Sequence, residues 1–561
     1  MTSPPLYCDK PTVNRLTSLL CQAGLHDVVV CPGSRNGVLT HNFHVCPALR
    51  CHPVTDERSA AFFALGLSLA THRPAAICVT SGSALLNTLP AVAEAAFRHV
   101  PLLIISADRP ADRIGQLDGQ TLPQPGALLP YAPCFNLPED GTPDAATWCN
   151  RLVNEALLAL RRDGGTPVHV NVPLREPLFS FGVPQLPDER LIHEVRPIAR
   201  APLPDGLVSK IKSARLPVLL LGERDDGPSP AAIQLDHGNR LLVLPELVAN
   251  QPGSFRTAIL EALPEAGGLR PDLVIHAGGT LVNKRLKQLL PTLPDCSVVR
   301  IEESNGLPDT FGRLTTVVRS PLEPVLRQLA ETLPPNDCVS REKKRLAAAA
   351  APLSAYRPAA FADIGIMQRL ASQLPPRGYS LHLGNSSVVR NACWFFDGGD
   401  VPIHCNRGLN GIEGSLSTAV GYASADSRPA LVLIGDLSFF YDQNALWNGA
   451  LPPNLRIVLF NNGGGQIFYR LPGLPASPAL TPLVAAAHHT SAEGLARSYG
   501  LSYHAVRDYD SLERAIGSLL APAGSRPVLV EAFTRTADNE SERLRLLHTV
   551  VSPSPTDIIH P

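Results

Sequence analysis

The chain has 561 residues, a formal net charge of −1 and a hydrophobic content of 44%. Such a length predicts about two to four domains, and the balanced charge gives no basic stripe for nucleic acid. No stretch approaches about 18 consecutive apolar residues, so we expect no membrane span. No secretory signal is visible at the N-terminus, and the 12 cysteines are scattered without CxxC pairs. We therefore expect a cytoplasmic protein with reduced thiols, without disulfides or a zinc site.

Apolar periodicity predicts alternating helices and strands in the first part of the chain, up to about residue 185. Alternation of this kind is typical of an α/β fold with a doubly wound parallel sheet. The predicted helices are 11–24, 57–72 and 84–99, and the predicted strands are 27–31, 75–79, 101–105 and 168–172.

Two further α/β segments follow, so we predict three domains, 1–185, 186–352 and 353–561. The proline-rich stretch 173–204 is interpreted as a linker, and the helical stretch 320–351 ends in a second one. The middle segment contains Gly-Gly but no GxGxxG, so a dinucleotide site is not supported. Its predicted strands are 217–221, 240–244, 272–276 and 297–301; those of the third segment are 380–383, 402–405, 430–434, 455–460, 503–506 and 528–532, with a helix over 413–425.

An acid and an amide follow two consecutive predicted strands of the third segment. Gly435-Asp436 comes after one strand and Asn461-Asn462 after the next, with a helix-length segment between them. Ligands of open parallel sheets bind at the carboxyl ends of the strands. Asp and Asn offer the hard oxygens that Mg²⁺ takes beside a phosphate, and Gly435 lets a ligand approach the backbone. The alternative is a plain strand-helix-strand unit with a capping Asp and a turn Asn.

The full string from Gly435 to Asn462 resembles the signature of the thiamine-diphosphate enzymes. The resemblance implies three α/β domains, in which the first binds the pyrimidine ring and the third binds the diphosphate. It also implies that Asp436, Asn462 and the carbonyl of Gly464 hold Mg²⁺ or Mn²⁺. Gly463 stands where relatives often carry a polar residue, which predicts a more flexible loop. The other residues expected to contact the cofactor are Ser81, Gly435, Leu437, Ser438, Ile467 and Phe468.

Glu57 opens a predicted helix directly after an extended stretch, and the residues behind it are apolar. Taken alone, it is an acid favoured by the helix dipole. The family places its catalytic Glu in this context, where a partly desolvated carboxyl shares a proton with the pyrimidine ring. The resemblance implies that Glu57 acts on the cofactor of a partner subunit, in a homodimer or homotetramer. Ile412 falls where the family places an apolar side chain under the cofactor; a core isoleucine is the alternative.

Six short strings occur in the same order as in one branch of this family and resemble it. That branch comprises the 2-succinyl-5-enolpyruvyl-6-hydroxy-3-cyclohexene-1-carboxylate (SEPHCHC) synthases of menaquinone biosynthesis. The resemblance implies a C–C bond-forming transferase that decarboxylates 2-oxoglutarate and adds the succinyl carbanion to isochorismate in a 1,4 manner. The strings are CPGSRN at 31–36, SADRP at 106–110, NKRL at 283–286, GNSSVVR at 384–390, NRGLNGIEG at 406–414 and NNGGGQIF at 461–468.

Both implied substrates are dicarboxylates, and arginine forks match carboxylates bidentately. Taken singly, each arginine is a solvated surface charge, but inside these strings we expect a role in binding. No histidine stands out near the strings. The cationic candidates are Arg35, Arg109, Lys284, Arg285, Arg390 and Arg407; the neutral ones are Ser34, Gln120 and Ser386; Phe468 and Leu471 are expected to line the pocket. We expect Glu57, Ser386, Arg390 and Arg407 to take part in catalysis.

Two other functions are open at this point. Another thiamine-diphosphate 2-oxoacid decarboxylase or carboligase would take less anionic substrates and would need fewer arginines. An acetohydroxyacid synthase would also bind a flavin in the middle domain, for which the sequence has no fingerprint. A catalytically inert homologue is the second alternative, but it would not need to keep Glu57, Asp436 and Asn462.

Overall fold

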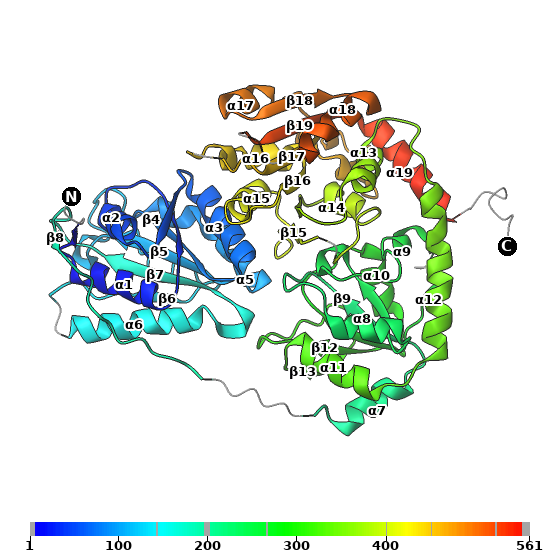
Figure 1. Cartoon of the computed structure of the whole chain (residues 1–561), viewed down its shortest axis with the longest axis horizontal. Helices are drawn as coiled ribbons and strands as arrows, with labels where there is room; N and C mark the ends of the chain where they lie inside the picture. The colour runs from blue at the N-terminus through cyan, green and yellow to red at the C-terminus, as the bar shows by residue number, and fades with distance from the viewer. Residues whose placement is uncertain are drawn as a thin grey trace. The chain divides into compact units, whose positions relative to one another are not determined.

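The structure is a computed structural model that describes residues 6–141, 144–195, 202–264, 268–399, 401–449, 451–521, 524 and 526–551. The chain divides into two compact units. The first comprises Met1–Ile198, Glu413–Ser427 and Asp442–Pro452, and the second comprises Ala199–Ile412, Arg428–Tyr441 and Pro453–Pro561. Parallel sheets flanked by helices confirm the predicted α/β class with doubly wound sheets (Figure 1). The domain boundaries near residues 185 and 352 stay a prediction.

A six-stranded parallel sheet with the order β3-β2-β4-β5-β7-β6 forms the body of the first unit. Strands such as β4 and β5 are buried along their whole length, as a sheet covered on both faces requires. The strands are β2 (Asp27–Val30), β3 (Arg50–Pro53), β4 (Ala75–Val79), β5 (Leu102–Asp108), β6 (Cys134–Asn136) and β7 (Pro167–Pro173), and β1 (Tyr7–Cys8) pairs separately with β8 (Phe181–Val183). The helices are α1 (Pro11–Gln22), α2 (Gly37–Val45), α3 (Glu57–Thr71), α4 (Ser83–Asn87), α5 (Leu89–Arg98) and α6 (Ala145–Ala159).

The predicted helix over 84–99 is in fact two helices, α4 and α5. The break falls at Thr88, just before Leu89-Pro90 at the start of α5. Proline has no backbone N–H and disfavours helical geometry in the residue before it, so it is accepted only in the first turn of a new helix. The break ends α4 after five residues and thereby shapes the segment that follows β4.

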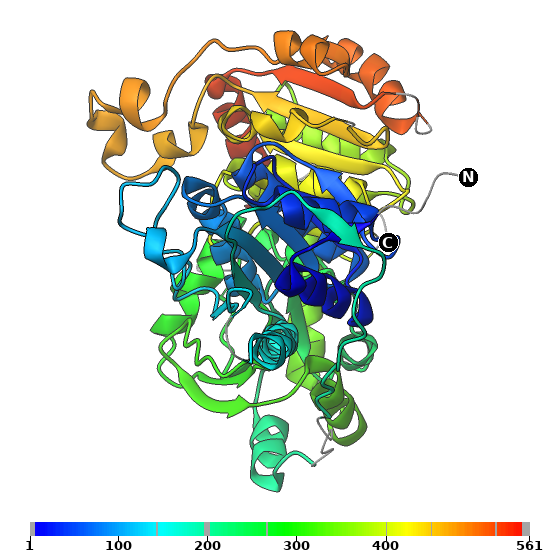
Figure 2. The same ribbon diagram turned by 90° about the vertical axis from the view of Figure 1, so that its left-hand side faces the viewer.

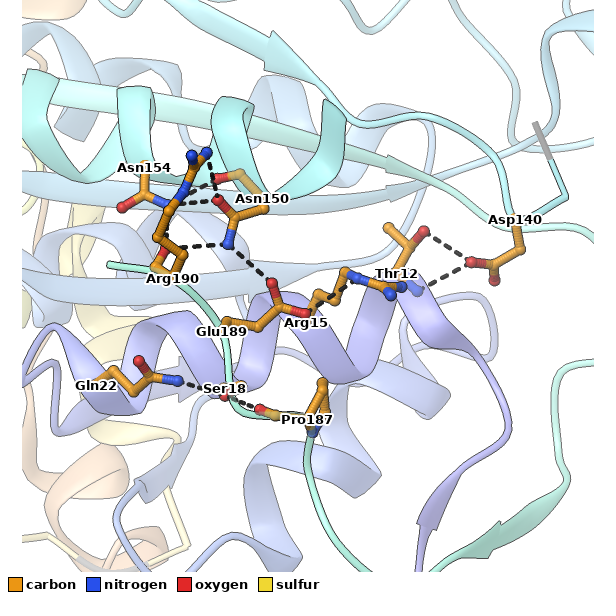
Figure 3. Close-up of polar contacts among 10 residues, drawn as sticks. All are labelled: Thr12, Arg15, Ser18, Gln22, Asp140, Asn150, Asn154, Pro187, Glu189 and Arg190. Carbon is orange, nitrogen blue, oxygen red and sulfur yellow. Dashed lines mark hydrogen bonds and ion pairs between the residues drawn. The ribbon is translucent and has the colours of Figure 1, made fainter. Parts of the chain in front are cut away.

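Much of the stretch predicted as a linker, 173–204, is packed against the first unit. Figure 3 shows Glu189 beside α1 and α6, where its carboxylate lies 3.0 Å from Arg15 Nε and accepts a hydrogen bond from Asn150 Nδ2 at 2.8 Å. A partly buried ion pair with an added amide contact fixes the backbone that carries it. The linker interpretation is therefore wrong for this part, and residues 196–201 lie outside the described residues.

Helix α15 (Ser415–Ala423) belongs to the first unit and packs closely on α3. A Cβ atom on Gly66 would lie 2.0 Å from the carbonyl oxygen of Thr418, and one on Gly421 would lie 2.0 Å from that of Phe63. The two backbones approach this closely because neither glycine has a side chain. This packing anchors α3, which begins at Glu57.

Two parallel sheets form the second unit. The five-stranded sheet has the order β10-β9-β11-β12-β13, and the six-stranded sheet has the order β15-β14-β16-β17-β19-β18, which repeats the connectivity of the first unit's sheet. The strands are β9 (Pro217–Leu221), β10 (Leu242–Pro245), β11 (Leu273–Ala277), β12 (Ser297–Ile301), β13 (Leu314–Val318), β14 (Ser380–Leu383), β15 (Ile403–Cys405), β16 (Ala430–Gly435), β17 (Leu455–Asn461), β18 (Ser502–Val506) and β19 (Val528–Phe533). In this order β16 lies between β14 and β17, so the chain segments after these strands meet at one edge of the sheet.

Helices cover the two sheets of the second unit. Figures 1 and 2 both show α18, in orange, beside β18 and β19. The helices are α7 (Asp205–Ser213), α8 (Pro230–His237), α9 (Ile259–Ala262), α10 (Lys284–Leu289), α11 (Leu322–Thr332), α12 (Asp337–Ala350), α13 (Asp363–Gln373), α14 (Ser387–Ala392), α16 (Asp436–Tyr441), α17 (Glu493–Ser498), α18 (Tyr509–Leu520) and α19 (Thr536–Val551). Across the described ranges, no helix is both long and apolar enough to cross a membrane.

One expectation for the second unit is wrong. The stretch 320–351 is not one helix ending in a linker but two helices, α11 and α12, because Pro334-Pro335 cannot continue a helix. The described part of the helix-length segment after Gly435 contains the six-residue helix α16 and, within the first unit, a short 3₁₀ turn over Gln443–Leu446.

The crevice at the carboxyl ends of β9 and β11 is filled by backbone. Gly279 N donates to the carbonyl of Glu223 at 2.8 Å, and Glu223 N donates to the carbonyl of Thr280 at 3.2 Å. A Cβ atom on Gly222 would lie 2.2 Å from the carbonyl oxygen of Gly279. In sheets with this strand order, nucleotide cofactors bind in that crevice. Such a cofactor would have to break these backbone contacts.

Candidate active site

Asp436 collects the backbone donors of the loop that follows β17. Its carboxylate is buried, and Oδ2 accepts hydrogen bonds from the N–H groups of Asn462 at 3.1 Å, Gly463 at 2.8 Å and Gly464 at 2.9 Å. Leu437 N donates to Oδ1 at 2.7 Å. Burial raises the pKa of Asp436, and the backbone donors counter that rise. The structure thus brings together the acid and the amide that the sequence places after two strands.

The loop after Asn462 is held by its own backbone. Gly463 has φ +80° and Gly464 has φ +149°, values that residues with a Cβ atom rarely adopt. The carbonyl of Gly463 accepts a hydrogen bond from His488 N at 3.0 Å, and Gly465 N donates to the carbonyl of Ala485 at 2.7 Å. The flexibility expected from Gly463 stays a prediction; in this structure the glycine permits the conformation that these hydrogen bonds hold.

His488 is a residue near the acid that the sequence did not reveal. Its Nε2 lies 3.4 Å from Asp436 Oδ2, and its ring meets Phe440 edge-on at a centroid distance of 5.5 Å. The residue lies in an irregular segment without a recognisable string, so no motif points to it. Its imidazole, a group that can titrate near neutral pH in proteins, thus lies beside the carboxylate of Asp436.

The side-chain oxygen of Asn462 is buried and unsatisfied. Its Nδ2 donates toward Asp363 Oδ2 at 3.5 Å and Gln466 Oε1 at 3.4 Å, whereas Oδ1 has no hydrogen-bond partner in the described chain. A buried acceptor left unpaired costs about 1–3 kcal/mol, which a cation would offset. A buried carboxylate, an orphan amide oxygen and the carbonyl of Gly464 form the hard-oxygen set that Mg²⁺ or Mn²⁺ takes. These residues fit such an ion.

Within the described ranges, acidic side chains form no second candidate for a cation site. Among the described residues, no group of three or more His, Cys, Asp or Glu side chains could hold a metal ion. A Cβ atom on Gly435 would meet only Val388 Cγ2, at 4.0 Å, so the backbone at this strand end is open on that side. The position of a diphosphate beside this strand end stays a prediction.

Ile412 is held near α16 by its backbone. Ser438 Oγ donates a hydrogen bond to the carbonyl of Ile412, which fixes the approach of this segment to the helix after Asp436. The isoleucine side chain is 37% exposed, so the core-isoleucine alternative is wrong. An apolar contact with the cofactor stays a prediction.

Two guanidinium groups of the second unit make no direct ion pair among the described residues, although the carboxylates of Glu246 and Glu261 act on them at longer range. Arg407 is buried, and the hydrogen bonds that it makes within the described ranges go to neutral oxygens, Asn385 Oδ1 at 3.1 Å and the carbonyl of Leu281 at 3.2 Å. Arg390 donates to the carbonyl of Ser386 at 2.7 Å. The Nε atoms of both arginines are buried without a partner in the described ranges. Burial and then the charge of Arg407 lower the pKa of Arg390, so the pair calls for an anionic ligand.

The residue directly after the NKRL string, Lys287, is a cation that was not among the predicted site residues. The backbone N–H groups of Lys284 and Arg285 bond to the carboxylate of Glu261, and their side chains are exposed. Lys287 lies one helical turn after Lys284 on α10, and its side chain is exposed as well. Burial and then the charge of Arg407 lower its pKa. Lys284 and Lys287 are three residues apart and therefore lie on the same face of a helix, and this spacing could have pointed to Lys287 from the sequence.

Glu57 is the first residue of α3, directly after the N-cap Asp56. Its side chain is half-buried, and Oε2 accepts a hydrogen bond from Asn87 Nδ2 at 3.1 Å. Burial and then the charge of Glu57 raise the pKa of Cys31, which places Glu57 beside the CPGSRN string. Ser81 is buried as well, and within the described residues its Oγ has no partner.

The two arginines predicted in the first unit differ in their surroundings. Arg35 is buried and already paired: Nη1 donates to the carbonyl of Leu174 at 3.0 Å, and Nη2 lies 3.2 Å from Glu176 Oε1. Arg109 Nη2 donates to the carbonyl of Gly119 at 3.2 Å, and its buried Nε finds no partner in the described part of the chain. Of the two, Arg109 is better suited to receive an anion.

Gln124, rather than the predicted Gln120, is held by buried hydrogen bonds within the first unit. Gln120 is exposed, whereas the buried Gln124 accepts a hydrogen bond from Gly82 N at 2.8 Å. Gln124 Nε2 donates to Asn171 Oδ1 at 2.8 Å and to Ser106 Oγ at 3.2 Å. It therefore ties the turn before α4 to β5 and β7, a role that no sequence pattern indicated.

Each predicted site residue can be assigned to one of the two units and to a degree of burial. Glu57, Ser34, Arg35, Ser81, Arg109 and Gln120 belong to the first unit, and the other predicted site residues belong to the second. The exposed ones are Ser34, Gln120, Lys284, Arg285, Ile412 and Leu471; the partly buried ones are Glu57, Arg109, Ser386, Arg390, Gly435, Leu437, Asn462, Gly464, Ile467 and Phe468; the buried ones are Arg35, Ser81, Arg407, Asp436 and Ser438.

Comparison with known proteins agrees with the resemblance. The family described as "Thiamine pyrophosphate enzyme, N-terminal TPP binding domain" matches residues 12–126. The 2-succinyl-5-enolpyruvyl-6-hydroxy-3-cyclohexene-1-carboxylate synthase of Bacteroides thetaiotaomicron is 39% identical over 97% of this chain and 98% of that protein. The synthase of the same name from Flavobacterium johnsoniae is 34% identical, over 93% of this chain and 96% of that protein.

A solved structure shares the fold. The thiamine diphosphate-dependent 4-hydroxybenzoylformate decarboxylase of Rhodococcus jostii RHA1 matches with a TM-score of 0.70 at 19% identity, covering 93% of this chain and 99% of that one. At this identity the likeness shows the fold alone. The full-length relatives go further: the chain belongs to the 2-succinyl-5-enolpyruvyl-6-hydroxy-3-cyclohexene-1-carboxylate synthase family of thiamine pyrophosphate enzymes.

Proposed function

We propose that this chain decarboxylates 2-oxoglutarate and adds the succinyl unit to isochorismate in a 1,4 manner, giving SEPHCHC for menaquinone biosynthesis. The observation that carries the proposal is the pair Arg390 and Arg407. Both guanidinium groups bond only neutral oxygens, and both keep a buried, unpaired Nε within the described chain. Two such cations suit a site that binds two dicarboxylates.

The cofactor of the reaction is proposed to be thiamine diphosphate with Mg²⁺ or Mn²⁺. When bound, thiamine diphosphate supplies a carbon nucleophile after its thiazolium ring loses a proton. Asp436, Asn462 and the carbonyl of Gly464 would hold the cation on the diphosphate, as the buried carboxylate and the orphan amide oxygen support. Glu57 would hold the proton shared with the pyrimidine ring, since its carboxyl is half-buried at a helix start.

The remaining residues would bind and orient the substrates. We assign Arg109, Arg390, Arg407 and Lys287 to the carboxylates and Ser386 to a neutral hydrogen bond. The backbone carbonyl of Ser386 accepts from Arg390, and Ser386 precedes the short helix that carries this arginine. Apolar side chains from Ile412, Phe468 and Leu471 would exclude water from the reacting atoms.

We further propose a homodimer or homotetramer in which Glu57 serves the cofactor held by a partner subunit. Large apolar side chains near Glu57 in the first unit support this, because Leu86 is 44% exposed and Trp447 is 53% exposed. Leu86 precedes the Asn87 that bonds Glu57. A second copy of the chain would cover such exposed apolar area. A cytoplasmic setting is proposed because all 12 cysteines are free thiols.

A substrate comparison tests the proposed reaction. With thiamine diphosphate and Mg²⁺, we expect the chain to consume 2-oxoglutarate and isochorismate together and to form SEPHCHC, as detected by mass spectrometry. Pyruvate should be turned over at least about 10²-fold less efficiently, because it lacks the second carboxylate that an arginine would bind. Efficient use of pyruvate would favour another decarboxylase or carboligase, and no turnover of any 2-oxoacid would favour the inert homologue.

A further inference from the structure

Asp363 is a buried carboxylate whose hydrogen-bond partners are all neutral. It is the first residue of α13 and is 5% exposed. Thr534 Oγ1 donates to its Oδ1 at 2.7 Å, and its own backbone N donates to Asn539 Oδ1 at 2.8 Å. The bond from Thr534 fixes Oδ1, the bond to Asn539 fixes the backbone, and the other carboxylate oxygen, Oδ2, lies 3.5 Å from Asn462 Nδ2. A buried carboxylate among neutral partners is costly, so its presence here calls for an explanation.

A primary amide can ligate a cation only through its oxygen. Its NH₂ end has nearly the same shape, so packing alone does not decide which end faces the cation. Asn462 Nδ2 is directed toward two acceptors, Asp363 Oδ2 and, at 3.4 Å, Gln466 Oε1. Gln466 Oε1 also accepts a hydrogen bond from Asn539 Nδ2 at 3.0 Å, and Asn539 Nδ2 donates to Thr534 Oγ1 at 3.1 Å. Both acceptors are therefore held by the same network. With the NH₂ end bound on one side, Oδ1 is left as the free end of the amide.

An ionised carboxylate enforces this orientation better than a neutral group does. It can only accept hydrogen bonds, so a rotated Asn462 would bring its amide oxygen against a negative oxygen atom. Asp436 also lies close enough for its charge to act on Asp363. A divalent cation bound at Asp436 would offset the repulsion between these two carboxylates.

We propose that Asp363 is a positioning residue for the divalent-cation site: with Gln466 it holds the NH₂ end of Asn462, so that Oδ1 faces the cation. The inference rests on the cation site of the proposed function. Asp363 does not touch the cation. It acts through Asn462, in the way that groups behind metal ligands orient those ligands.

Mn²⁺ binding in the presence of thiamine diphosphate tests this role, with free Mn²⁺ followed by electron paramagnetic resonance. Asp363→Ala removes the acceptor, and we expect the Kd for Mn²⁺ to rise about 10–100-fold. Asp363→Asn can still turn an oxygen toward Asn462 and should restore most of the affinity. At saturating Mn²⁺ the kcat of both variants should approach that of the wild type, since the residue acts only through the cation.

Asp442 provides a matched control. This aspartate is also buried and also has a neutral partner, Ser417, whose N and Oγ donate to it at 2.7 Å and 2.8 Å. Burial raises the pKa of both carboxyls to about 6. Asp442→Ala should lower thermal stability and leave the Kd for Mn²⁺ unchanged. Equal weakening of Mn²⁺ binding by Asp442→Ala and Asp363→Ala would overturn the proposal, because the effect would then be general loosening of the fold.

Other outcomes separate this inference from the proposed function. Wild-type affinity in Asp363→Ala, together with lost affinity in Asp436→Asn, would overturn the role of Asp363 and leave the cation site intact. If Asp363→Ala does not fold, wild-type Mn²⁺ binding by Asp363→Leu would overturn it equally. The wild-type protein could also bind Mn²⁺ and yet not use 2-oxoglutarate. The proposed reaction would then fail, while weak Mn²⁺ binding by Asp363→Ala would still support the role of Asp363.

Discussion

Glu57→Gln is expected to bind thiamine diphosphate and Mg²⁺ almost as well as the wild type but to lose about 10²–10⁴-fold in kcat. Glutamine has nearly the same shape and can keep the hydrogen bond from Asn87. It cannot share a titrating proton with the pyrimidine ring, so the proton at C2 of the thiazolium ring should exchange slowly. Hydrogen–deuterium exchange at C2 of the bound cofactor, read by NMR, measures this step directly.

The neighbouring acid gives the control for this experiment. Asp56 caps α3 by accepting a hydrogen bond from Ser59 N at 2.8 Å, and its other oxygen accepts one from Asn444 Nδ2 at 2.7 Å. Asp56→Ala should therefore lower stability by about 1 kcal/mol, as loss of a cap does, and leave C2 exchange near the wild-type rate. Near-normal exchange in Glu57→Gln, or a larger loss in Asp56→Ala, would show that the catalytic acid is wrongly assigned.

Arg390→Ala and Arg407→Ala are each expected to raise KM for a dicarboxylate substrate and to lower kcat/KM about 10–100-fold, the equivalent of about 1.5–3 kcal/mol for a charge-assisted hydrogen bond. Both guanidinium groups are partly or wholly buried, and their hydrogen bonds within the described chain go to neutral groups. Lysine at either position should restore little, because it lacks the planar fork. Steady-state kinetics with 2-oxoglutarate and isochorismate varied in turn would measure the loss for each substrate.

A buried arginine outside the candidate site controls for loss of packing. Arg300 is buried in the five-stranded sheet and is paired with Glu302 at 2.7 Å. Arg300→Ala should lower stability, because it leaves Glu302 buried without its partner, and should not change KM. Unchanged kinetics in both Arg390→Ala and Arg407→Ala would mean that the anionic substrates bind elsewhere.

Some of the buried strands could be predicted to the residue, whereas the longer strands β5 and β7 were predicted with other ends. β4, β9 and β14 match the predicted ranges because each is a buried run ended by turn residues or charges. β6 and β13 were not predicted, and β3 was predicted only as an extended stretch. These strands are short or only partly buried and carry residues such as Arg50, Asn136 and Thr315. Apolar periodicity cannot show a strand whose side chains are half-exposed.

Spacing along the chain predicted which residues of the candidate site lie together only for residues that directly follow neighbouring strands. The rule that parallel strands end at one edge was enough to place Asp436 beside Asn462. The groups that orient Asn462 come from α13 and from the start of α19, far from β17 in sequence. No local pattern connects Asp363 or Asn539 to that amide, because only the folded sheet brings them together. Lys287 differs, since its helical spacing was visible in the sequence.

The central claim is that Glu57 of one subunit and the Asp436–Asn462 site of another serve the same cofactor. Dimers of one Glu57→Gln chain and one Asp436→Asn chain, purified through two different tags, test it directly. A two-fold dimer of this kind would contain one intact site and one doubly altered site, so we predict about half of the wild-type activity from two nearly inactive parents. Mixed dimers as inactive as their parents would contradict the claim, because every site would then carry one lesion.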